Sequence, residues 1–444
     1  MGETYDLIIK GATIVNHAGT FEGDVASTNG KTVAIGSLDA NKADKVIDAK
    51  GLHLLPGVID SQVHFREPGS THKEDLESGS RGAVLGGVTA VFEMPNTNPL
   101  TTTVAAIEDK IARGRDRMWC DFAFYVGATA ENAEELATLE MMEGCCGVKV
   151  FMGASTGNLL VSDDETLERV LRHGKRRVAI HAEDEDRMEE REPLRHKGGV
   201  HSHPIWRDEE TALRATQRVV TLARKTGRRI HVLHVTTAEE MAYLAQHKDI
   251  ATVEATPQHL TLSAPDAYDR LGTLAQMNPP IRDKKHMPGL WQAVSNGVVD
   301  VIGSDHAPHS REEKAAGYPN TPSGMPGVQT LLPVLLNHVA EGRMSMERLV
   351  DLTSHGAHRI FNLRDKGRLA VGYDADYTLV DLKKSWVIED RLMASKCGWT
   401  PFHNMRVKGQ PIGTIIRGKQ VMWEGKLAEK AHGAPIRFQE TIRQ

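Results

Sequence analysis

Apolar residues along the chain follow three successive patterns. In residues 1–56 the runs YDLIIKGATIV, GDVAS and KTVAIGS are short, β-prone and separated by Gly, Asn and Asp, as in strands joined by turns. Residues 57–368 alternate short apolar runs with longer amphipathic segments, and residues 369–444 return to β-type runs with glycine turns. The pattern predicts a central domain at 57–368 and a small β-sandwich to which residues 1–56 and 369–444 both contribute.

The central domain is predicted to repeat a strand–helix unit. Its strand-like runs are GVTAVFEM, CDFAFYVG, GVKVFMG, RRVAIHA, RRIHVLHV, IATVEAT and VVDVIGS. Between them lie helix-like segments, and RDEETALRATQRVVTLARKTG ends on a basic turn followed by glycine, which is typical of a helix terminus. This alternation predicts an α/β fold of parallel strands crossed by helices, and the length fits a TIM-like (β/α)8 barrel.

Composition limits the partners. The 444 residues are 40% hydrophobic, enough for a large core, and the net charge of −5 comes without a basic block. We therefore expect neither nucleic acid nor a membrane surface as a partner. The four cysteines show no CxxC spacing, no apolar run approaches the roughly 18 residues of a membrane span, and the N-terminus does not resemble a signal peptide. These features predict a cytoplasmic protein with reduced thiols.

Five residues that can take part in metal binding lie at strand-like runs of the central domain. They are His64, Lys149, His181, His234 and Asp305. The gaps between them correspond to one to three strand–helix units of roughly 30 residues each. Since every strand of a parallel barrel ends on the same face, we expect the five side chains to meet in one pocket. Imidazole nitrogens and a carboxylate suit zinc, and an open coordination position would hold a water molecule.

Each of these residues also has a simpler explanation. A single buried histidine such as His64 is more often structural than a metal ligand. Lys149 would be costly to bury as a bare charge, so it either extends its amine to solvent or is chemically changed by a partner. Asp305 in VIGSDHAPH is hard to explain as part of a solvated loop, and it is suited to take a proton from a metal-bound water.

The chain resembles the cyclic amidohydrolases, and among them the dihydroorotases of the longer bacterial type. The segments that carry the resemblance are LPGVIDSQVHFREPG, GGVTAVFEMPNTNP, GVKVFMG, IHAED, HVLHVTT, MNPPIR, GSDHAPHS and SKCGWTPF, in this order over nearly the whole length. Dihydroorotate carries a carboxylate, for which Arg66 in REPG supplies a cationic fork. Allantoinases and hydantoinases generally lack this arginine because their substrates lack this carboxylate.

The resemblance implies a site with two zinc ions. Lys149 would be N-carboxylated and bridge both ions, His64 and Asp305 would bind one ion, and His181 and His234 the other. A hydroxide between the ions, which would lie about 3.5–4 Å apart, would attack the ring carbonyl, and Asp305 would carry its proton to the leaving nitrogen. The positions that bind substrate in the family correspond to Asn96, Asn278 and His309, with backbone groups near Pro322 and Gly324.

Position 62 departs from the family, which usually has histidine where this chain has Gln62. An amide oxygen is a weaker zinc ligand than imidazole. Gln62 would therefore bind weakly, or water would fill the position, or one metal site would be partly empty. Some dihydroorotase-like chains have lost activity and serve as scaffolds for aspartate transcarbamoylase. Because the other functional residues are all present, we expect an active enzyme.

The sequence thus predicts a zinc-dependent dihydroorotase that reversibly converts dihydroorotate to carbamoyl-aspartate in de novo pyrimidine biosynthesis. Two alternatives remain, namely another cyclic amidohydrolase of the allantoinase or hydantoinase type, and a catalytically silent partner of aspartate transcarbamoylase. A homo-oligomer is expected from the family. The charged segment at residues 311–324, which contains Gly and Pro, is either a lid over the pocket or a surface excursion.

Overall fold

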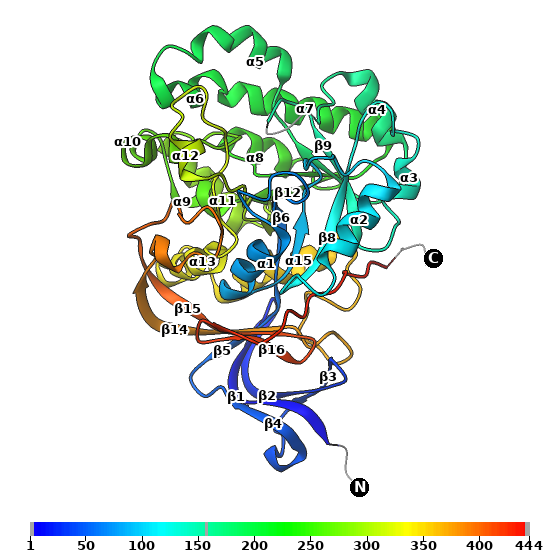
Figure 1. Ribbon diagram of the computed structural model, residues 1–444, viewed down its shortest axis with the longest axis vertical. Helices are drawn as coiled ribbons and strands as arrows, with labels where there is room; N and C mark the ends of the chain where they lie inside the picture. The colour runs from blue at the N-terminus through cyan, green and yellow to red at the C-terminus, as the bar shows by residue number, and fades with distance from the viewer. Residues whose placement is uncertain (1–3, 156–158, 440–444) are drawn as a thin grey trace.

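The computed structural model describes residues 4–155 and 159–439. A barrel of strands surrounded by helices packs against a separate sheet to which both ends of the chain contribute (Figure 1). Within the described ranges, no helix combines the length and apolar character needed to cross a lipid bilayer. The predicted barrel and the small β domain built from both termini are confirmed.

Eight strands follow one another in sequence order around the barrel, and every neighbouring pair is parallel. They are β6 (Val58–Val63), β7 (Val88–Glu93), β8 (Asp121–Gly127), β9 (Cys145–Phe151), β10 (Val178–His181), β11 (Ile230–Val232), β12 (Ala251–Ala255) and β13 (Val301–Ile302). A parallel bridge from Val63 to His306 links the first strand to the segment after the last one. His64 adds a hydrogen bond from its backbone N–H to the carbonyl of His306 over 2.7 Å.

Helices lie between the barrel strands and after the last of them, as the amphipathic segments of the central domain predict. The helices are α1 (Leu76–Leu85), α2 (Val104–Gly114), α3 (Leu136–Leu139), α4 (Asp164–Arg172), α5 (Glu185–Arg191), α6 (His203–Trp206), α7 (Glu209–Thr226), α8 (Ala238–Ala245), α9 (Pro257–Thr261), α10 (Asp266–Leu271), α11 (Met287–Ser295), α12 (Arg311–Lys314), α13 (Leu331–Ala340), α14 (Met346–Val350) and α15 (Gly356–Phe361). Helix α7 ends at Gly227, whose φ of 71° is the left-handed conformation of a glycine cap, as the sequence predicts.

The small β domain is one connected mixed sheet of nine strands. From the N-terminal part come β1 (Tyr5–Asn16), β2 (Gly19–Thr28), β3 (Lys31–Gly36), β4 (Ala43–Asp48) and β5 (His53–Pro56); from the C-terminal part come β14 (Tyr377–Val387), β15 (Arg406–Ile416), β16 (Lys419–Trp423) and β17 (Lys426–Leu427). The two parts meet where β5 pairs antiparallel with β14, with Pro56 opposite Tyr377. This pairing places the end of the N-terminal part directly before β6, the first strand of the barrel.

Strand β9 shows how an apolar run delivers a charged group to the barrel interior. Successive residues of a strand point to opposite sides. Val148 and Val150 therefore pack in the large apolar core that also includes residues of the surrounding helices. Lys149, between them, points the other way and is fully buried. The valines on either side thus hold the lysine in place.

Candidate active site

A pocket opens at the end of the barrel where the strands terminate, and most of the predicted residues line it. Its lining consists of Gln62, His64, Arg66, Asn96, Phe151, Ser155, His181, His234, Asn278, Asp305, Ala307, Ser323 and Gly324. His181 is the last residue of β10, and His64, His234 and Asp305 lie one to three residues beyond β6, β11 and β13. The parallel barrel therefore gathers residues that are far apart in the sequence, as predicted.

Three residues of the pocket have a left-handed backbone although they are not glycine. The φ angles are 62° at Arg66, 37° at His234 and 45° at Asp305. Such conformations cost roughly 1–3 kcal/mol each and persist only where the surrounding structure enforces them. Each of these residues directly follows or lies close to a strand end, so the chain turns sharply there and directs its side chain into the pocket.

The histidines and Asp305 form two close pairs. Nδ1 of His181 lies 3.0 Å from Nε2 of His234, and Nε2 of His64 lies 3.3 Å from Oδ1 of Asp305. Burial lowers the pKa of all three histidines. They are therefore neutral near pH 7, which is the form of imidazole that binds metal.

Lys149 lies beside these pairs with no hydrogen-bond acceptor for its amine in the described parts of the chain. Its Nζ lies 4.3 Å from the centre of the Phe151 ring. Burial lowers the pKa of Lys149 to about 7, although Asp305 and Glu254 act in the opposite direction. A large fraction of the amine is therefore neutral at physiological pH, and a neutral amine can react with carbon dioxide to form a carbamate.

The residues present fit a pair of bridged metal ions. Among the described residues, no group of three or more His, Cys, Asp or Glu side chains is arranged to hold a metal by itself. Each close pair supplies only two donor groups, whereas a catalytic zinc site usually has three from the protein. Lys149 is near enough to influence the pKa values of His64, His181 and His234. A carbamate on Lys149 would offer one oxygen to each pair and supply the missing third donor.

Gln62 contacts Asp305 and faces the pocket. Its amide nitrogen donates to Oδ1 of Asp305 over 3.0 Å. Its amide oxygen is buried and has no hydrogen-bond partner within the described residues. This amide oxygen lies near His64 and Asp305, which can bind metal. Its lack of a partner among the described residues is consistent with weak ligation of a metal by Gln62, one of the three outcomes that the sequence left open.

Glu183 and Arg207 support His181, and the sequence analysis did not identify them. Nε2 of His181 lies 2.8 Å from Oε2 of Glu183, which also accepts from Nη1 of Arg207 at 2.5 Å. Burial opposes ionisation of Glu183, but Arg207 and His181 outweigh it and lower the pKa of this carboxyl to about 2. Glu183 is therefore an anion that fixes the ring of His181 with Nδ1 toward His234. Glu183 could have been predicted from IHAED, where it lies two residues after His181, because residues two apart in an extended segment point to the same side.

Arg66, Asn96 and Asn278 present hydrogen-bond donors to the pocket. The amide oxygen of Asn96 lies 2.8 Å from Nδ1 of His64, and that of Asn278 lies 3.0 Å from Nε2 of His203. With each oxygen held by a histidine N–H, the NH2 end of each amide faces away from that histidine. Burial lowers the pKa of Arg66 to about 10, which leaves its guanidinium charged at neutral pH. This combination suits an anionic group on the ligand.

His203 was not predicted, and nothing in its local sequence indicates its role. It is fully buried, and Nε2 also lies 2.9 Å from the carbonyl of Met277. Burial lowers the pKa of His203 to about 3, with Arg207 acting in the same direction. It is therefore a neutral ring whose Nε2–H is shared between two oxygens, and this fixes the orientation of the Asn278 amide.

Of the other predicted substrate positions, His309 contacts Arg66 but does not itself line the pocket. Nε of Arg66 donates to the carbonyl of Pro308 over 3.1 Å, and Nη2 lies 3.2 Å from Nε2 of His309. Gly324 lines the pocket, whereas Pro322 is not part of the lining. The carbonyl of Pro322 instead accepts a hydrogen bond from Lys314 over 2.9 Å.

Lys314 holds the segment at residues 311–324 against the pocket. Its buried Nζ also donates to the carbonyls of Gln276 and Gly324, each over 3.0 Å. The side chain thus ties helix α12 to the pocket wall at Gly324. At the end of the segment Ser323 and Gly324 line the pocket, whereas most of residues 311–320 are exposed.

Comparisons with known proteins agree with this geometry. Residues 53–421 match the model of the amidohydrolase family. A dihydroorotase of Halobacterium salinarum is 38% identical over 86% of this chain and 89% of its own length. An allantoinase of Deinococcus radiodurans is 32% identical over 97% of this chain and 98% of its own length. The solved structure of an L-hydantoinase (dihydropyrimidinase) from Arthrobacter aurescens superimposes with a TM-score of 0.92 at 28% identity, covering 98% of this chain and all of that one.

Proposed function

Since the chain belongs to the amidohydrolase family, we propose that it hydrolyses a cyclic amide and that its substrate is L-dihydroorotate. The product would be N-carbamoyl-L-aspartate, and the reverse reaction would serve de novo pyrimidine biosynthesis. The curated dihydroorotases among its relatives support the reaction class. We further propose a cytoplasmic homo-oligomer.

One observation carries the choice of substrate. Buried Arg66 shares the pocket with Asn96 and Asn278, whose amide oxygens are both held by histidines. The pocket therefore presents the guanidinium of Arg66 beside two amide side chains, of which Asn278 also donates from its NH2 to Oγ of Ser155 over 3.4 Å. A buried guanidinium in such polar surroundings suits a carboxylate. Dihydroorotate has a carboxylate on its ring, whereas hydantoin and allantoin lack it. With hydantoin or allantoin bound, the buried guanidinium of Arg66 would have no substrate anion to pair with.

The proposal includes two zinc ions held by a carboxylated Lys149. His64, Asp305 and one carbamate oxygen would hold the first, with Gln62 as a weak additional ligand, and His181, His234 and the second oxygen would hold the other. When bound, the ions supply a hydroxide nucleophile near neutral pH and polarise the ring carbonyl.

The residues of the chain then orient the substrate and move the proton. Arg66, Asn96 and Asn278 fix the carboxylate, which sets the position of the ring carbonyl. Asp305 accepts the proton of the attacking oxygen and transfers it to the ring nitrogen as the C–N bond breaks. In the reverse direction Asp305 removes a proton from the carbamoyl nitrogen as the C–N bond forms and returns it to the departing carboxyl oxygen, which leaves as hydroxide when the C–O bond breaks.

A second candidate is supported by particular relatives. Allantoinases and hydantoinases share the fold and nearly the full length of the chain. Activity on hydantoin or allantoin with none on dihydroorotate would reject the first proposal in favour of this one. Co-purification with aspartate transcarbamoylase, without turnover of any ring substrate, would favour a silent partner.

The experiment is a turnover assay of the purified protein with dihydroorotate, hydantoin and allantoin at matched concentrations, together with its zinc content. We expect turnover of dihydroorotate alone, with up to two zinc ions per chain. The same assay on Arg66→Lys, which keeps the charge but not the fork, separates carboxylate recognition from general loss of activity. No turnover of dihydroorotate after reconstitution with zinc and bicarbonate would overturn the proposal.

A further inference from the structure

We propose that Glu74 and His306 form a positioning pair that holds Asp305 in its left-handed turn and fixes the Arg66 loop relative to it. The inference rests on the proposed function in so far as Asp305 is the proton carrier. Neither residue lines the pocket that holds Asp305. Both are almost completely buried.

His306 occupies the point where the barrel closes. It directly follows Asp305, and its carbonyl accepts the backbone N–H of His64 over 2.7 Å. Parallel bridges join His306 to Val63 on one side and to Met325 on the other. A shift of His306 would therefore move Asp305 through the chain and His64 through the hydrogen bond.

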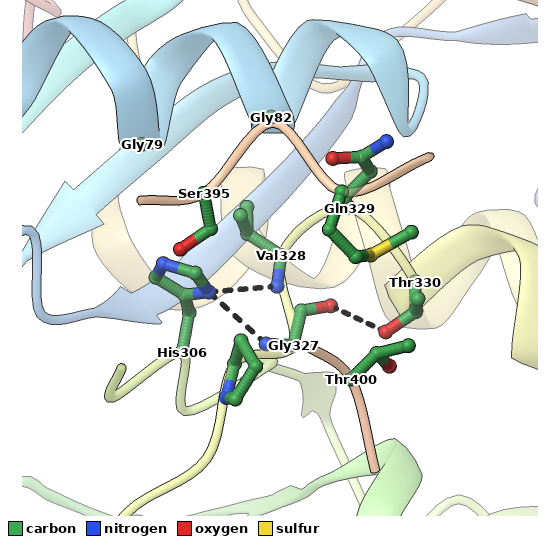
Figure 2. A pocket seen from close by; sticks show the side chains of 11 residues that line it. Gly79, Gly82, His306, Gly327, Val328, Gln329, Thr330, Ser395 and Thr400 are labelled. Atoms are coloured by element: carbon green, nitrogen blue, oxygen red, sulfur yellow. Dashed lines mark hydrogen bonds between the residues drawn. The ribbon is translucent and has the colours of Figure 1, made fainter. Parts of the chain in front are cut away.

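The ring of His306 is fixed at both nitrogens. Nδ1 accepts the backbone N–H groups of Gly327 at 3.0 Å and Val328 at 3.4 Å, as Figure 2 shows. Because Nδ1 is an acceptor, the N–H of the ring that can donate lies at Nε2. Nε2 lies 3.3 Å from Oε2 of Glu74, which is therefore its acceptor.

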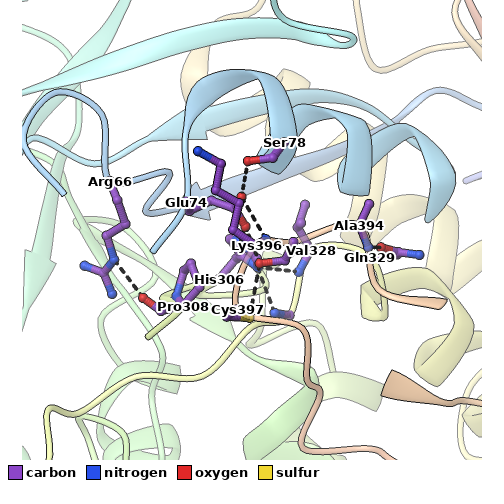
Figure 3. Close-up of polar contacts among 12 residues, drawn as sticks. Arg66, Glu74, Ser78, His306, Pro308, Val328, Gln329, Ala394, Lys396 and Cys397 are labelled. Atoms are coloured by element: carbon purple, nitrogen blue, oxygen red, sulfur yellow. Dashed lines mark hydrogen bonds and ion pairs between the residues drawn. The ribbon is translucent and has the colours of Figure 1, made fainter. Parts of the chain in front are cut away.

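Glu74 joins three separate segments of the chain (Figure 3). Its carboxylate accepts the hydroxyls of Ser78 at the start of α1 and Ser395 in the C-terminal part. The backbone N–H of Lys396 lies 3.4 Å from Oε1. Glu74 itself belongs to the connection between β6 and α1, which also carries Arg66. One carboxylate thus ties the Arg66 connection, the Asp305 turn and the segment around residue 395 together.

The turn at Asp305 needs such support. A φ of 45° at a non-glycine residue is unfavourable by roughly 1–3 kcal/mol unless neighbouring contacts enforce it. On the C-terminal side of Asp305, the contacts of the His306 ring provide this enforcement. Pro308 lies two residues after His306, and its carbonyl accepts a hydrogen bond from Nε of Arg66 over 3.1 Å. The pair therefore sets the distance between the group that binds the substrate and the group that moves the proton.

Two substitutions of His306 separate the two ends of the ring. His306→Asn keeps an acceptor near the position of Nδ1 but loses the contact with Glu74. His306→Gln keeps a donor near the position of Nε2 but loses the acceptor for Gly327 and Val328. Glu74→Gln keeps the size of the side chain and removes its charge. Glu240→Gln is the matched control, because Glu240 is equally buried and accepts from Thr216 and Thr237 on the α8 side of the barrel.

We expect Glu74→Gln and His306→Asn each to lower kcat about tenfold to a hundredfold, since small misplacements of reacting groups have effects of this size. KM should change less than kcat, because the guanidinium of Arg66 remains. The kcat per bound zinc should fall by the same tenfold to hundredfold, because the ligands remain and the loss comes from the displaced Asp305. The double variant should be no slower than the slower single variant, because both break the same link. His306→Gln should retain more activity than His306→Asn, and Glu240→Gln should keep the wild-type kcat.

Three results would overturn the proposal. These are a kcat within twofold of wild type in folded Glu74→Gln, losses that multiply in the double variant, and activity that falls in proportion to zinc. If wild type does not turn over dihydroorotate, the proposed function fails, and the pair is then judged with whichever ring substrate wild type does hydrolyse. A crystal structure of Glu74→Gln gives a reading independent of substrate, because an unchanged left-handed Asp305 would also reject the pair.

Discussion

Gln62 donates a hydrogen bond from its amide nitrogen to Oδ1 of Asp305 over 3.0 Å, and His64 approaches the same oxygen at 3.3 Å. The residue that departs from the family pattern is therefore in direct contact with the proposed proton carrier. Its amide oxygen is buried and has no hydrogen-bond partner among the described residues. Gln62 is thus placed to act directly on Asp305.

Replacing Gln62 with histidine should strengthen binding of the more weakly held metal by about tenfold, because imidazole is a better zinc ligand than an amide oxygen. The measurement is zinc per chain after dialysis against a series of chelator concentrations. Gln62→Leu, which has no oxygen, is the control and should lose that metal more readily than wild type. Equal zinc retention in all three proteins would show that residue 62 is not a ligand.

Replacing Arg66 with alanine should raise KM for dihydroorotate by about tenfold to a hundredfold, the effect of losing a charge-assisted hydrogen bond worth roughly 1.5–3 kcal/mol. Zinc content should stay at the wild-type value, because Arg66 contacts Pro308 and His309 and no proposed ligand. Steady-state kinetics and metal analysis on the same preparation check both statements. An unchanged KM would contradict the carboxylate assignment.

Replacing His203 with phenylalanine should raise KM for dihydroorotate by about fivefold to tenfold, because the Asn278 amide loses the contact that orients it. His201→Phe is a matched control two residues away, since the side chain of His201 is 47% exposed and does not contact Asn278 through any described hydrogen bond. Equal effects of the two substitutions would reject an orienting role for His203.

Recovery of activity by the metal-free protein should depend on carbon dioxide and on pH, because the neutral amine of Lys149 must first form a carbamate. Burial lowers the pKa of its amine from 10.5 to about 7, so the neutral, reactive fraction rises as pH increases through 7. At a fixed concentration of dissolved carbon dioxide, metal-free protein given zinc should regain activity about tenfold faster at pH 8 than at pH 6. Lys149→Ala should stay inactive under both conditions and recover in part with acetate or propionate. Equal recovery rates with and without carbon dioxide would rule out the carbamate.

The sequence predicted the barrel and most of the pocket because both follow from local patterns. Apolar runs at regular intervals define the strands, and polar residues at their ends must meet if the strands are parallel. His64, His181, His234 and Asp305, which the pattern predicts to meet, line one pocket. Lys149, which its apolar sequence context makes costly to bury as a charge, lies inside the barrel without a hydrogen-bond partner in the described chain.

The residues that orient the site residues could not be predicted from the sequence. Their contacts are made by loops, and loops leave no periodic pattern of apolar and polar positions. His203 meets Asn278 across 75 positions in the sequence, and Glu74 meets Ser395 across 321. Lys314 looked like part of a charged surface segment, yet three backbone carbonyls accept from its buried amine. Contacts of this kind depend on the final packing of loops, whereas strand ends depend on local spacing.

The pairing of β5 with β14 has a consequence for how the protein is made. Strand β5 ends at Pro56, and its antiparallel partner begins at Tyr377. A ribosome that adds about 5–20 residues per second needs on the order of half a minute to produce the residues between them. Throughout that time the edge of β5 lacks its native partner, and an unpaired strand edge can pair with other chains. The sheet of the β domain can therefore be completed only near the end of synthesis.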